Sequence, residues 1–141
     1  MTQQTWAFLG GKQVPEENAM VGVKTHALHY GTAVFEGIRG NWNERLGKVA
    51  IFRLKEHYER LLRGCQILRI NLPYSVDDLC KITTDLLEKN GFAEDVYIRP
   101  LAFKGEQLVA NLNLNTVADE FMLIIQPFGN YIDNSRPLKC Q

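Results

Sequence analysis

The side chains of this sequence best suited to bind a ligand are a closely spaced tyrosine and arginine and a second arginine earlier in the chain. Tyr97 and Arg99 are two residues apart in an apolar, strand-like segment, so both side chains would project from the same face of a sheet. They could line a site or form a solvated pair on an edge strand. Arg60 carries a planar guanidinium group that suits a bound phosphate. It lies off the apolar stripe of its own segment, however, and this periodicity alone favours a solvated arginine.

Net charge and cysteine spacing argue against several other kinds of chemistry. Sixteen Lys and Arg residues balance sixteen Asp and Glu residues, which favours neither nucleic acid nor an anionic membrane surface. Cys65, Cys80 and Cys140 are widely spaced and form no C-x-x-C pair, so we expect free thiols and no metal. No apolar run approaches the roughly 18 residues of a membrane helix, and the first residues do not resemble a secretory signal. The sequence therefore predicts a cytoplasmic protein that binds neither nucleic acid nor membranes.

Two β-hairpins are expected in the first third of the chain. Gly10 and Gly11 separate two short apolar segments and can adopt the positive φ angles of a two-residue hairpin turn. Residues 34–42 and 48–54 are again apolar and β-prone, and the polar segment 43–47 between them ends in glycine. This second pattern also predicts a hairpin.

Two amphipathic helices are expected next. Apolar residues recur at helical spacing between residues 55 and 68, and most charged residues lie off that stripe. In the second helix, Ser75 is suited to be the N-cap with Asp78 three residues later, and Asn90-Gly91 can end the helix. Its predicted core-facing residues are Leu79, Ile82 and Leu86.

Two further strands are expected at residues 96–103 and 121–125, the second of which is a continuous apolar run typical of a buried strand. Pro100 lacks an N–H group, so we expect it where no neighbouring strand needs that donor. Residues 104–119 between the strands are rich in Asn and lack a period, which predicts a long loop. This order of elements predicts an α+β domain with a mainly antiparallel sheet flanked by helices.

Four separated motifs give the sequence a specific resemblance to a known family. They are H-A-L-H-Y-G-T-A-V-F-E-G-I-R at residues 26–39, F-R-L-K-E-H-Y-E-R-L at 52–61, V-Y-I-R-P-L at 96–101 and P-F-G-N-Y at 127–131. Their order and spacing resemble the N-terminal small domain of branched-chain amino acid aminotransferases, which are fold-type IV pyridoxal-phosphate enzymes. The resemblance implies that residues 1–129 form this small domain and that residues 130–141 begin an interdomain linker.

The resemblance implies a transaminase that moves an amino group between Leu, Ile or Val and 2-oxoglutarate, with pyridoxal 5′-phosphate as its cofactor. Such an enzyme needs a Schiff-base lysine and a carboxylate for the pyridine nitrogen, and the resemblance places both beyond Gln141. None of the eight lysines here, Lys104 and Lys139 included, stands in the context of a catalytic lysine. We therefore expect no catalytic residue in this chain, and we expect the chain alone to be inactive.

Recognition residues, in contrast, are expected within this chain. Arg60 matches the family's phosphate-binding arginine, while Tyr97 and Arg99 match positions near the substrate's carboxylate groups. Arg99 could hold the side-chain carboxylate of glutamate. The residues that match positions lining the side-chain pocket are Tyr30, Phe35 and Tyr131. Tyr30 is expected to serve the neighbouring subunit's site, which implies a homodimer, and Phe35 could instead be a core residue.

Other residues of the first motif are expected to support the site indirectly. Glu36 and Arg39 are candidates for an ion pair or hydrogen-bond support, and His26 and His29 for packing and hydrogen-bond contacts at a turn-like segment. The loop at residues 105–110 matches a loop that family dimers send over the partner's pocket. It lacks the glycine-spaced form of the family, so the preferred substrate side chain stays open.

Three alternatives remain beside a branched-chain aminotransferase. An aminodeoxychorismate lyase and a D-amino acid aminotransferase share the fold, but the presence of Tyr97 and Arg99 together with Tyr131 argues against the lyase. The third alternative is a non-catalytic binding or dimerisation module. The polar, proline-containing segment 130–141 argues against it, because it resembles an interdomain linker.

Overall fold

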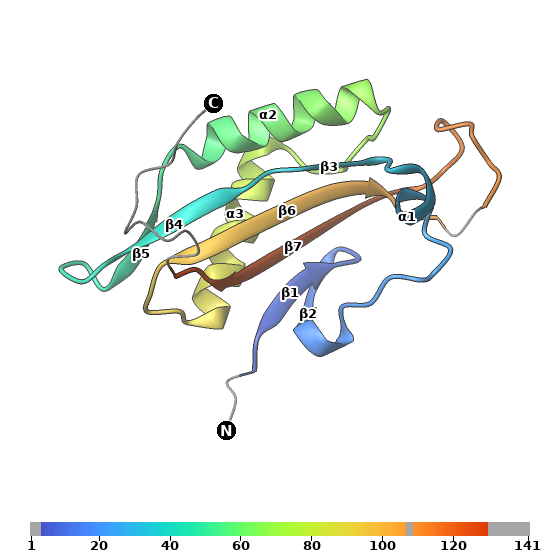
Figure 1. The fold of residues 1–141 in the computed structure, drawn as a ribbon. Coiled ribbons are helices and arrows are strands. Elements are labelled where there is room, and N and C mark those ends of the chain that lie inside the picture. The colour runs from blue at the N-terminus through green and yellow to red at the C-terminus, as the bar shows by residue number, and fades with distance from the viewer. Residues whose placement is uncertain (1–3, 107–108, 130–141) are drawn as a thin grey trace, which may run out of the picture.

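A seven-stranded sheet organises the part of the chain that the structure, a computed structural model, describes: residues 4–106 and 109–129 (Figure 1). The strands are β1 (Trp6–Leu9), β2 (Lys12–Pro15), β3 (Ala33–Phe35), β4 (Ile38–Asn43), β5 (Lys48–Ile51), β6 (Val96–Lys104) and β7 (Asp119–Pro127). Their order is β2-β1-β7-β6-β4-β5, with β3 also paired to β6, and every pairing is antiparallel. The predicted α+β class with a mainly antiparallel sheet is confirmed.

The core lies between one face of this sheet and two helices, α2 and α3 (Figure 1). The helical segments are α1 (His26–Tyr30), α2 (Leu54–Ile67), α3 (Val76–Asn90) and the 3-10 helix η1 (Glu16–Asn18). In β6, Ile98 and Ala102 are completely buried beneath the helices, whereas Tyr97 and Arg99 alternate with them and are only partly buried. Because successive side chains of a strand point to opposite faces, Tyr97 and Arg99 lie on the face without α2 and α3, which we call the open face.

Both long helices begin and end close to their predicted positions. At the start of α3 the backbone N–H of Asp78 donates to Ser75 Oγ over 3.1 Å, and the Ser75 N–H donates to Asp78 Oδ2 over 2.8 Å. This capping box is the predicted one, and Gly91 ends the helix with a left-handed φ of 64°. The predicted core residues of α3 are buried or pack against the core: Leu79, Ile82 and Leu86. No helix among the described residues is long and apolar enough to cross a membrane.

Both predicted hairpins form, but the strand expected at residues 34–42 is divided into β3 and β4 at Glu36 and Gly37. The two halves pair with β6 in the same register. At the junction the Glu36 N–H donates to the Pro100 carbonyl over 3.2 Å, and proline has no N–H to donate in return. The missing donor interrupts the ladder. Pro100 therefore sits in a central strand, opposite a break in the pairing.

Two other expectations about local structure need correction. The segment at His26 and His29, expected as a turn, forms the short helix α1, which ends at Gly31 with a left-handed φ of 65°. The first and last residues of the expected loop 104–119 belong to β6 and β7, so both strands are longer than predicted. The apolar pattern did not reveal these ends because Lys104, Asp119 and Glu120 are charged, and β7 also continues past its predicted end to Pro127.

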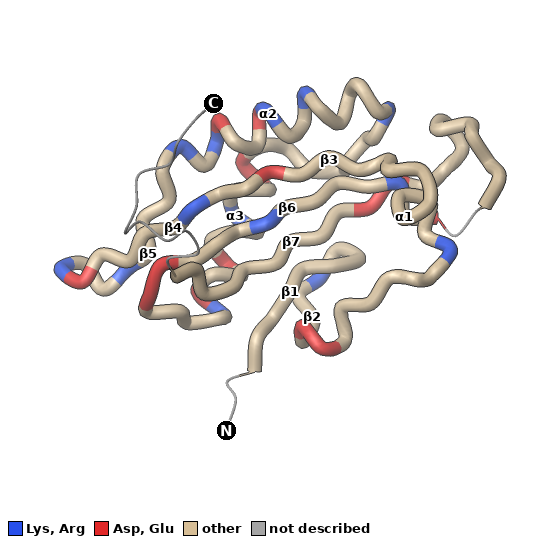
Figure 2. The backbone as a smooth tube through the Cα atoms, viewed as in Figure 1, with Lys and Arg blue, Asp and Glu red and all other residues tan. Residues whose placement is uncertain are grey.

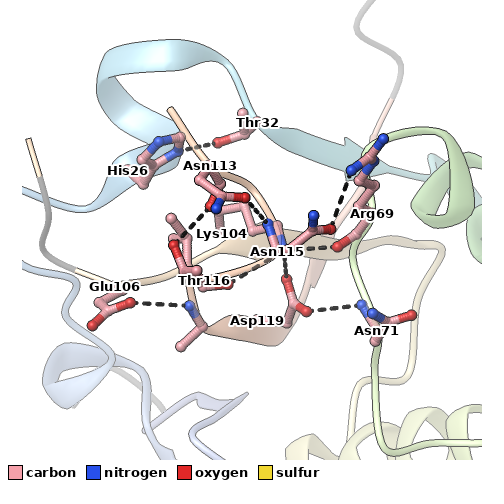
Figure 3. Close-up of polar contacts among 12 residues, drawn as sticks. His26, Thr32, Arg69, Asn71, Lys104, Glu106, Asn113, Asn115, Thr116 and Asp119 are labelled. Atoms are coloured by element: carbon pink, nitrogen blue, oxygen red, sulfur yellow. Dashed lines mark hydrogen bonds and ion pairs between the residues drawn. The ribbon is translucent and has the colours of Figure 1, made fainter. Parts of the chain in front are cut away.

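A buried ion pair explains why charged residues extend β6 and β7. Figure 2 shows basic and acidic segments side by side where β6 ends and β7 begins. Lys104 is 1% exposed, and its Nζ lies 2.6 Å from Asp119 Oδ1 and donates to the carbonyls of Arg69 at 2.7 Å and Val117 at 3.3 Å. Asp119 Oδ2 accepts from the Asn71 N–H over 2.9 Å (Figure 3). The pair therefore fastens the connection between α2 and α3 to the end of the sheet.

We predict that Lys104→Met lowers the free energy of unfolding by about 3–5 kcal/mol, because it leaves the Asp119 charge and two carbonyls without their cation. Urea denaturation of the protein measures the change. The matched control is Lys81→Met, since Lys81 is 74% exposed in its pair with Asp85 and should contribute less than about 1 kcal/mol. Adding Asp119→Leu to Lys104→Met should recover part of the loss. Equal stability of the two lysine variants would show that the buried pair does not hold the sheet end.

Candidate functional site

Three of the predicted site residues form one cluster on the open face. Arg99 donates from Nε and Nη2 to the Tyr97 hydroxyl oxygen, at 3.1 and 2.5 Å. The guanidinium carbon of Arg99 also lies 4.3 Å from the centroid of the Phe35 ring, within the range of a cation–π contact. Phe35 is 55% exposed, so it is not a core residue in this chain. The cluster therefore presents a fixed cation between two aromatic side chains.

Gly37 is a residue of this cluster that the sequence interpretation missed. A Cβ atom built on Gly37 would lie 2.7 Å from the Tyr97 hydroxyl oxygen, closer than such contacts occur. Any other residue would push the Tyr97 ring away from its place beside Arg99. The only signal for this in the sequence is a glycine inside a β-prone segment, which marks a close approach without naming the partner.

Arg60 is held by a carboxylate on the opposite face of the sheet. Its Nε and Nη2 donate to Glu36 Oε1 and Oε2, both at 2.6 Å. His57, one helical turn before Arg60 on α2, places Nδ1 3.0 Å from Glu36 Oε2. A carboxylate accepts hydrogen bonds, so Nδ1 carries the proton, and its 3.4 Å approach to Arg60 Nη2 joins two donors and is not a hydrogen bond. Glu36 thus forms the expected ion pair, and its partners are Arg60 and His57.

The electrostatics of this group keep Glu36 charged and Arg60 available. The hydrogen bond from Arg60 lowers the pKa of Glu36 below its ordinary value; burial opposes the shift, and the His57 hydrogen bond adds to it. The Arg60 side chain is 63% exposed although Glu36 is only 7% exposed. Since Glu36 uses Nε and part of Nη2, the remaining N–H groups of Arg60 can receive an anion from outside. A phosphate fits this donor set.

Tyr30 lies apart from the other predicted residues, at the far end of the sheet. Its hydroxyl oxygen accepts from the Ala110 N–H over 2.8 Å, and its ring stacks on His26 at a centroid distance of 4.5 Å. His26 is buried between Thr32 and the Asn111 carbonyl, at 2.8 and 2.7 Å from its two ring nitrogens. His26 thus makes packing and hydrogen-bond contacts, as expected. Hydrogen bonds from Ala110 to Tyr30 and between His26 and Asn111 therefore hold α1 against the segment after residue 108.

Of the remaining expected residues, Arg39 has a structural role and Tyr131 cannot be placed. Arg39 pairs with Asp95 at 2.7 Å near the base of the β4–β5 hairpin. Tyr131 lies outside the residues that the structure describes. Cys65 and Cys80 are free thiols. Among the described residues, no group of three or more His, Cys, Asp or Glu side chains could hold a metal ion.

A cavity among the described residues lies elsewhere, between the β4–β5 hairpin and the end of α3. It has a volume of about 490 Å³, and its walls include Trp42, Val49, Leu87 and Phe92. None of the predicted site residues lines it. We place the candidate site on the open face instead, because Arg99 and the rings of Tyr97 and Phe35 converge there. The exposed Arg60 is held nearby, by Glu36 at the junction of β3 and β4.

Comparison with known proteins shows that the chain is similar to aminotransferases. The family model of class IV aminotransferases matches residues 33–140. A probable branched-chain-amino-acid aminotransferase of Aquifex aeolicus is 43% identical over 137 residues, which cover 96% of this chain and 43% of that protein. The crystal structure of the branched-chain aminotransferase of Thermoproteus uzoniensis with norvaline has a TM-score of 0.85 at 37% identity, and covers 92% of this chain and 42% of its own.

A second solved structure, the branched-chain amino acid aminotransferase of T.th. complexed with N-(5'-phosphopyridoxyl)-L-glutamate, has a TM-score of 0.81 at 35% identity over 94% of this chain and 43% of its own. The matched part thus spans 32% to 43% of the length of the curated relatives. The family match covers most of the chain, and the shared fold includes the sheet that carries the candidate site. The chain belongs to the class IV aminotransferase family.

Proposed function

We propose that this chain is the small domain of a pyridoxal-phosphate-dependent transaminase that moves an amino group between Leu, Ile or Val and 2-oxoglutarate. The observation that carries the proposal is the contact of Arg99 with Tyr97 and Phe35 on the open face. Similar enzymes have been crystallised with norvaline and with N-(5'-phosphopyridoxyl)-L-glutamate. One of these ligands has an apolar side chain and the other an acidic one, and a transaminase of this kind must accept both types.

The cluster offers a separate partner for each type of substrate. Arg99 is the cation that would bind the side-chain carboxylate of glutamate, because a guanidinium group pairs with a carboxylate through two parallel hydrogen bonds. The Phe35 ring and the Tyr97 ring form apolar surface beside it for an aliphatic side chain. Tyr131, outside the described residues, is proposed to complete this wall.

Arg60 is proposed to bind the coenzyme phosphate through the N–H groups that Glu36 leaves free. When bound, pyridoxal phosphate supplies a reactive carbonyl carbon and a ring that withdraws electrons from the substrate. Arg60 is suited to hold its phosphate because a guanidinium stays charged and can bind two phosphate oxygens at once.

We assign residues 1–129 to the small domain, residues 130–141 to a linker, and the Schiff-base lysine to sequence beyond Gln141. Lys104 is buried, and its amino group is paired with Asp119 and two backbone carbonyls, which gives it a structural role. Lys55 and Lys81 are exposed in surface ion pairs on the helices. The share of the curated relatives that the matched part spans, 32% to 43%, leaves room for a second domain.

We further propose a homodimer in the cytoplasm. Support comes from a group of exposed apolar side chains around α1: Met20, Val23, Leu28, Tyr30, Val109 and Leu112. Large apolar side chains exposed in one region often mark a protein interface. In a dimer this surface would bring Tyr30 to the partner's pocket. Free thiols at Cys65 and Cys80 fit a reducing compartment.

We predict that the chain by itself lacks the lysine that forms the Schiff base. With one equivalent of pyridoxal phosphate and borohydride, it should show no lysine labelled to a near-stoichiometric level, because the Schiff-base lysine is assigned elsewhere. Intact mass and peptide mapping measure the label. The complete enzyme, treated in the same way, should carry one adduct outside residues 1–141. Full labelling of one lysine within this chain would refute the assignment.

For the substrate site, we predict that Arg99→Met in the complete enzyme lowers kcat/KM for glutamate by about 10- to 100-fold, since about 1.5–3 kcal/mol of charge-assisted hydrogen bonding is lost. The value for leucine should change less than about threefold. The two half-reactions are measured separately by the coenzyme absorbance. Arg45→Met, at the exposed tip of the β4–β5 hairpin, is the matched control. An equal loss for both amino acids would contradict a carboxylate-specific contact.

For the assembly, we predict that the complete enzyme sediments as a dimer and that Leu28→Asp shifts it toward monomer. A charge in an apolar interface loses its hydration without gaining a partner, which disfavours association. Analytical ultracentrifugation measures the shift. Leu46→Asp is the control, because Leu46 is 69% exposed on the β4–β5 turn and Leu28 is 64% exposed. A variant that dimerises like the parent protein would exclude this surface as the interface.

A further inference from the structure

Glu36 is a buried carboxylate that neither the open-face cluster nor the ligand chemistry of Arg60 uses directly. It sits at the junction of β3 and β4, beside Phe35 in the sequence, and its side chain points to the helix-covered face. Two basic groups of α2, Arg60 and His57, converge on its two oxygens at 2.6 to 3.0 Å. A buried charge with this many directed partners fixes the geometry of each of them.

The backbone and the surrounding side chains hold Glu36 itself in place. Its N–H donates to the Pro100 carbonyl, and the strands on either side of it both pair with β6. The side chain is 7% exposed and its pKa is lowered by Arg60, so it remains a carboxylate at neutral pH. Glu36 is therefore a rigid anchor, whereas Arg60 is 63% exposed and would have many accessible rotamers without it.

We propose that Glu36 is a positioning residue that holds the Arg60 guanidinium in the orientation that receives the coenzyme phosphate. The inference rests on the proposed function, because it takes Arg60 as the phosphate ligand. Glu36 binds the edge formed by Nε and Nη2, which directs the Nη1 edge of the group outward. His57 Nδ1 donates a second hydrogen bond to Glu36 Oε2 and so restrains the carboxylate that holds Arg60.

Whether Glu36→Gln weakens or strengthens phosphate binding shows whether Glu36 acts by orienting Arg60 or only through its charge. Removal of a negative charge close to Arg60 makes the surroundings of the phosphate more positive, so simple electrostatics predicts tighter phosphate binding for Glu36→Gln. Loss of the anchor predicts weaker binding, because the freed arginine must be ordered again when the phosphate binds. The two explanations therefore predict opposite changes of one measured quantity.

The experiment compares pyridoxal phosphate with pyridoxal, which lacks the phosphate, in the complete enzyme. Absorbance titration gives the dissociation constant of each ligand for the parent protein and for Glu36→Gln. We expect the dissociation constant of pyridoxal phosphate to rise about tenfold, which is about 1.4 kcal/mol, and that of pyridoxal to change less than about twofold, because only phosphate binding has to order the freed Arg60 side chain again. Equal weakening of both ligands would mean a purely structural role and would overturn the proposal, as would tighter binding of pyridoxal phosphate.

Three further variants complete the test. Glu59→Gln removes the same charge from an exposed position one residue before Arg60 and should leave both constants unchanged. Arg60→Lys keeps the charge but lacks the fork that pairs with Glu36; it should weaken pyridoxal phosphate selectively, and it carries the test if Glu36→Gln does not fold. Arg60→Ala tests the underlying assignment. If it leaves phosphate binding intact, the proposed role of Arg60 fails; if it weakens binding and the Glu36 and Lys variants do not, only the positioning role fails.

Discussion

The alternation of side chains along β6 is the constraint on which both the core and the candidate site depend. Ile98 and Ala102 point toward α2 and α3, and Tyr97 and Arg99 point to the open face. Burial of the first pair holds the strand against the helices, and the pleat then determines where the second pair must lie. A shift of one residue in the pairing of β6 would exchange the two sets. The packing of the core thus fixes the position of a cation on the opposite surface.

Pro100 gives the same strand a second function, at the junction of β3 and β4. Its missing N–H interrupts the ladder where Glu36 and Gly37 lie, and each of these residues serves a different side of the sheet. Gly37 leaves space for the Tyr97 hydroxyl on the open face, while the Glu36 carboxylate binds Arg60 on the helix side. A single break in regular hydrogen bonding therefore connects the two groups that the proposed function assigns to coenzyme and substrate. The two neighbouring residues at this break, Glu36 and Gly37, thus couple the position of Arg60 on one face of the sheet to that of Tyr97 on the other.

The opposite end of the sheet is held by polar contacts instead of apolar packing. Lys104 and Asp119 are buried together and bind backbone groups at Arg69 and Asn71 (Figure 3). Lys104 also donates to the Val117 carbonyl. Because a buried charge is stable only with directed partners, these contacts set the geometry of the strand ends more narrowly than apolar contacts would. They support the described part of the segment between β6 and β7, which contacts α1. This end carries the exposed apolar surface assigned to a partner subunit.

The sequence by itself determined the features that depend on neighbouring residues. The period of apolar residues located α2 and α3, the Ser75 capping box and the Gly10-Gly11 turn were readable from residue types, and the pleat rule placed Tyr97 and Arg99 on one face. Motif order indicated the family. Only the tertiary structure decided that Glu36 is the anchor of Arg60, 24 positions away, and that a lysine at the end of β6 is buried. Such contacts join residues that are distant in the chain, and their energy depends on burial and direction, which local pattern does not encode.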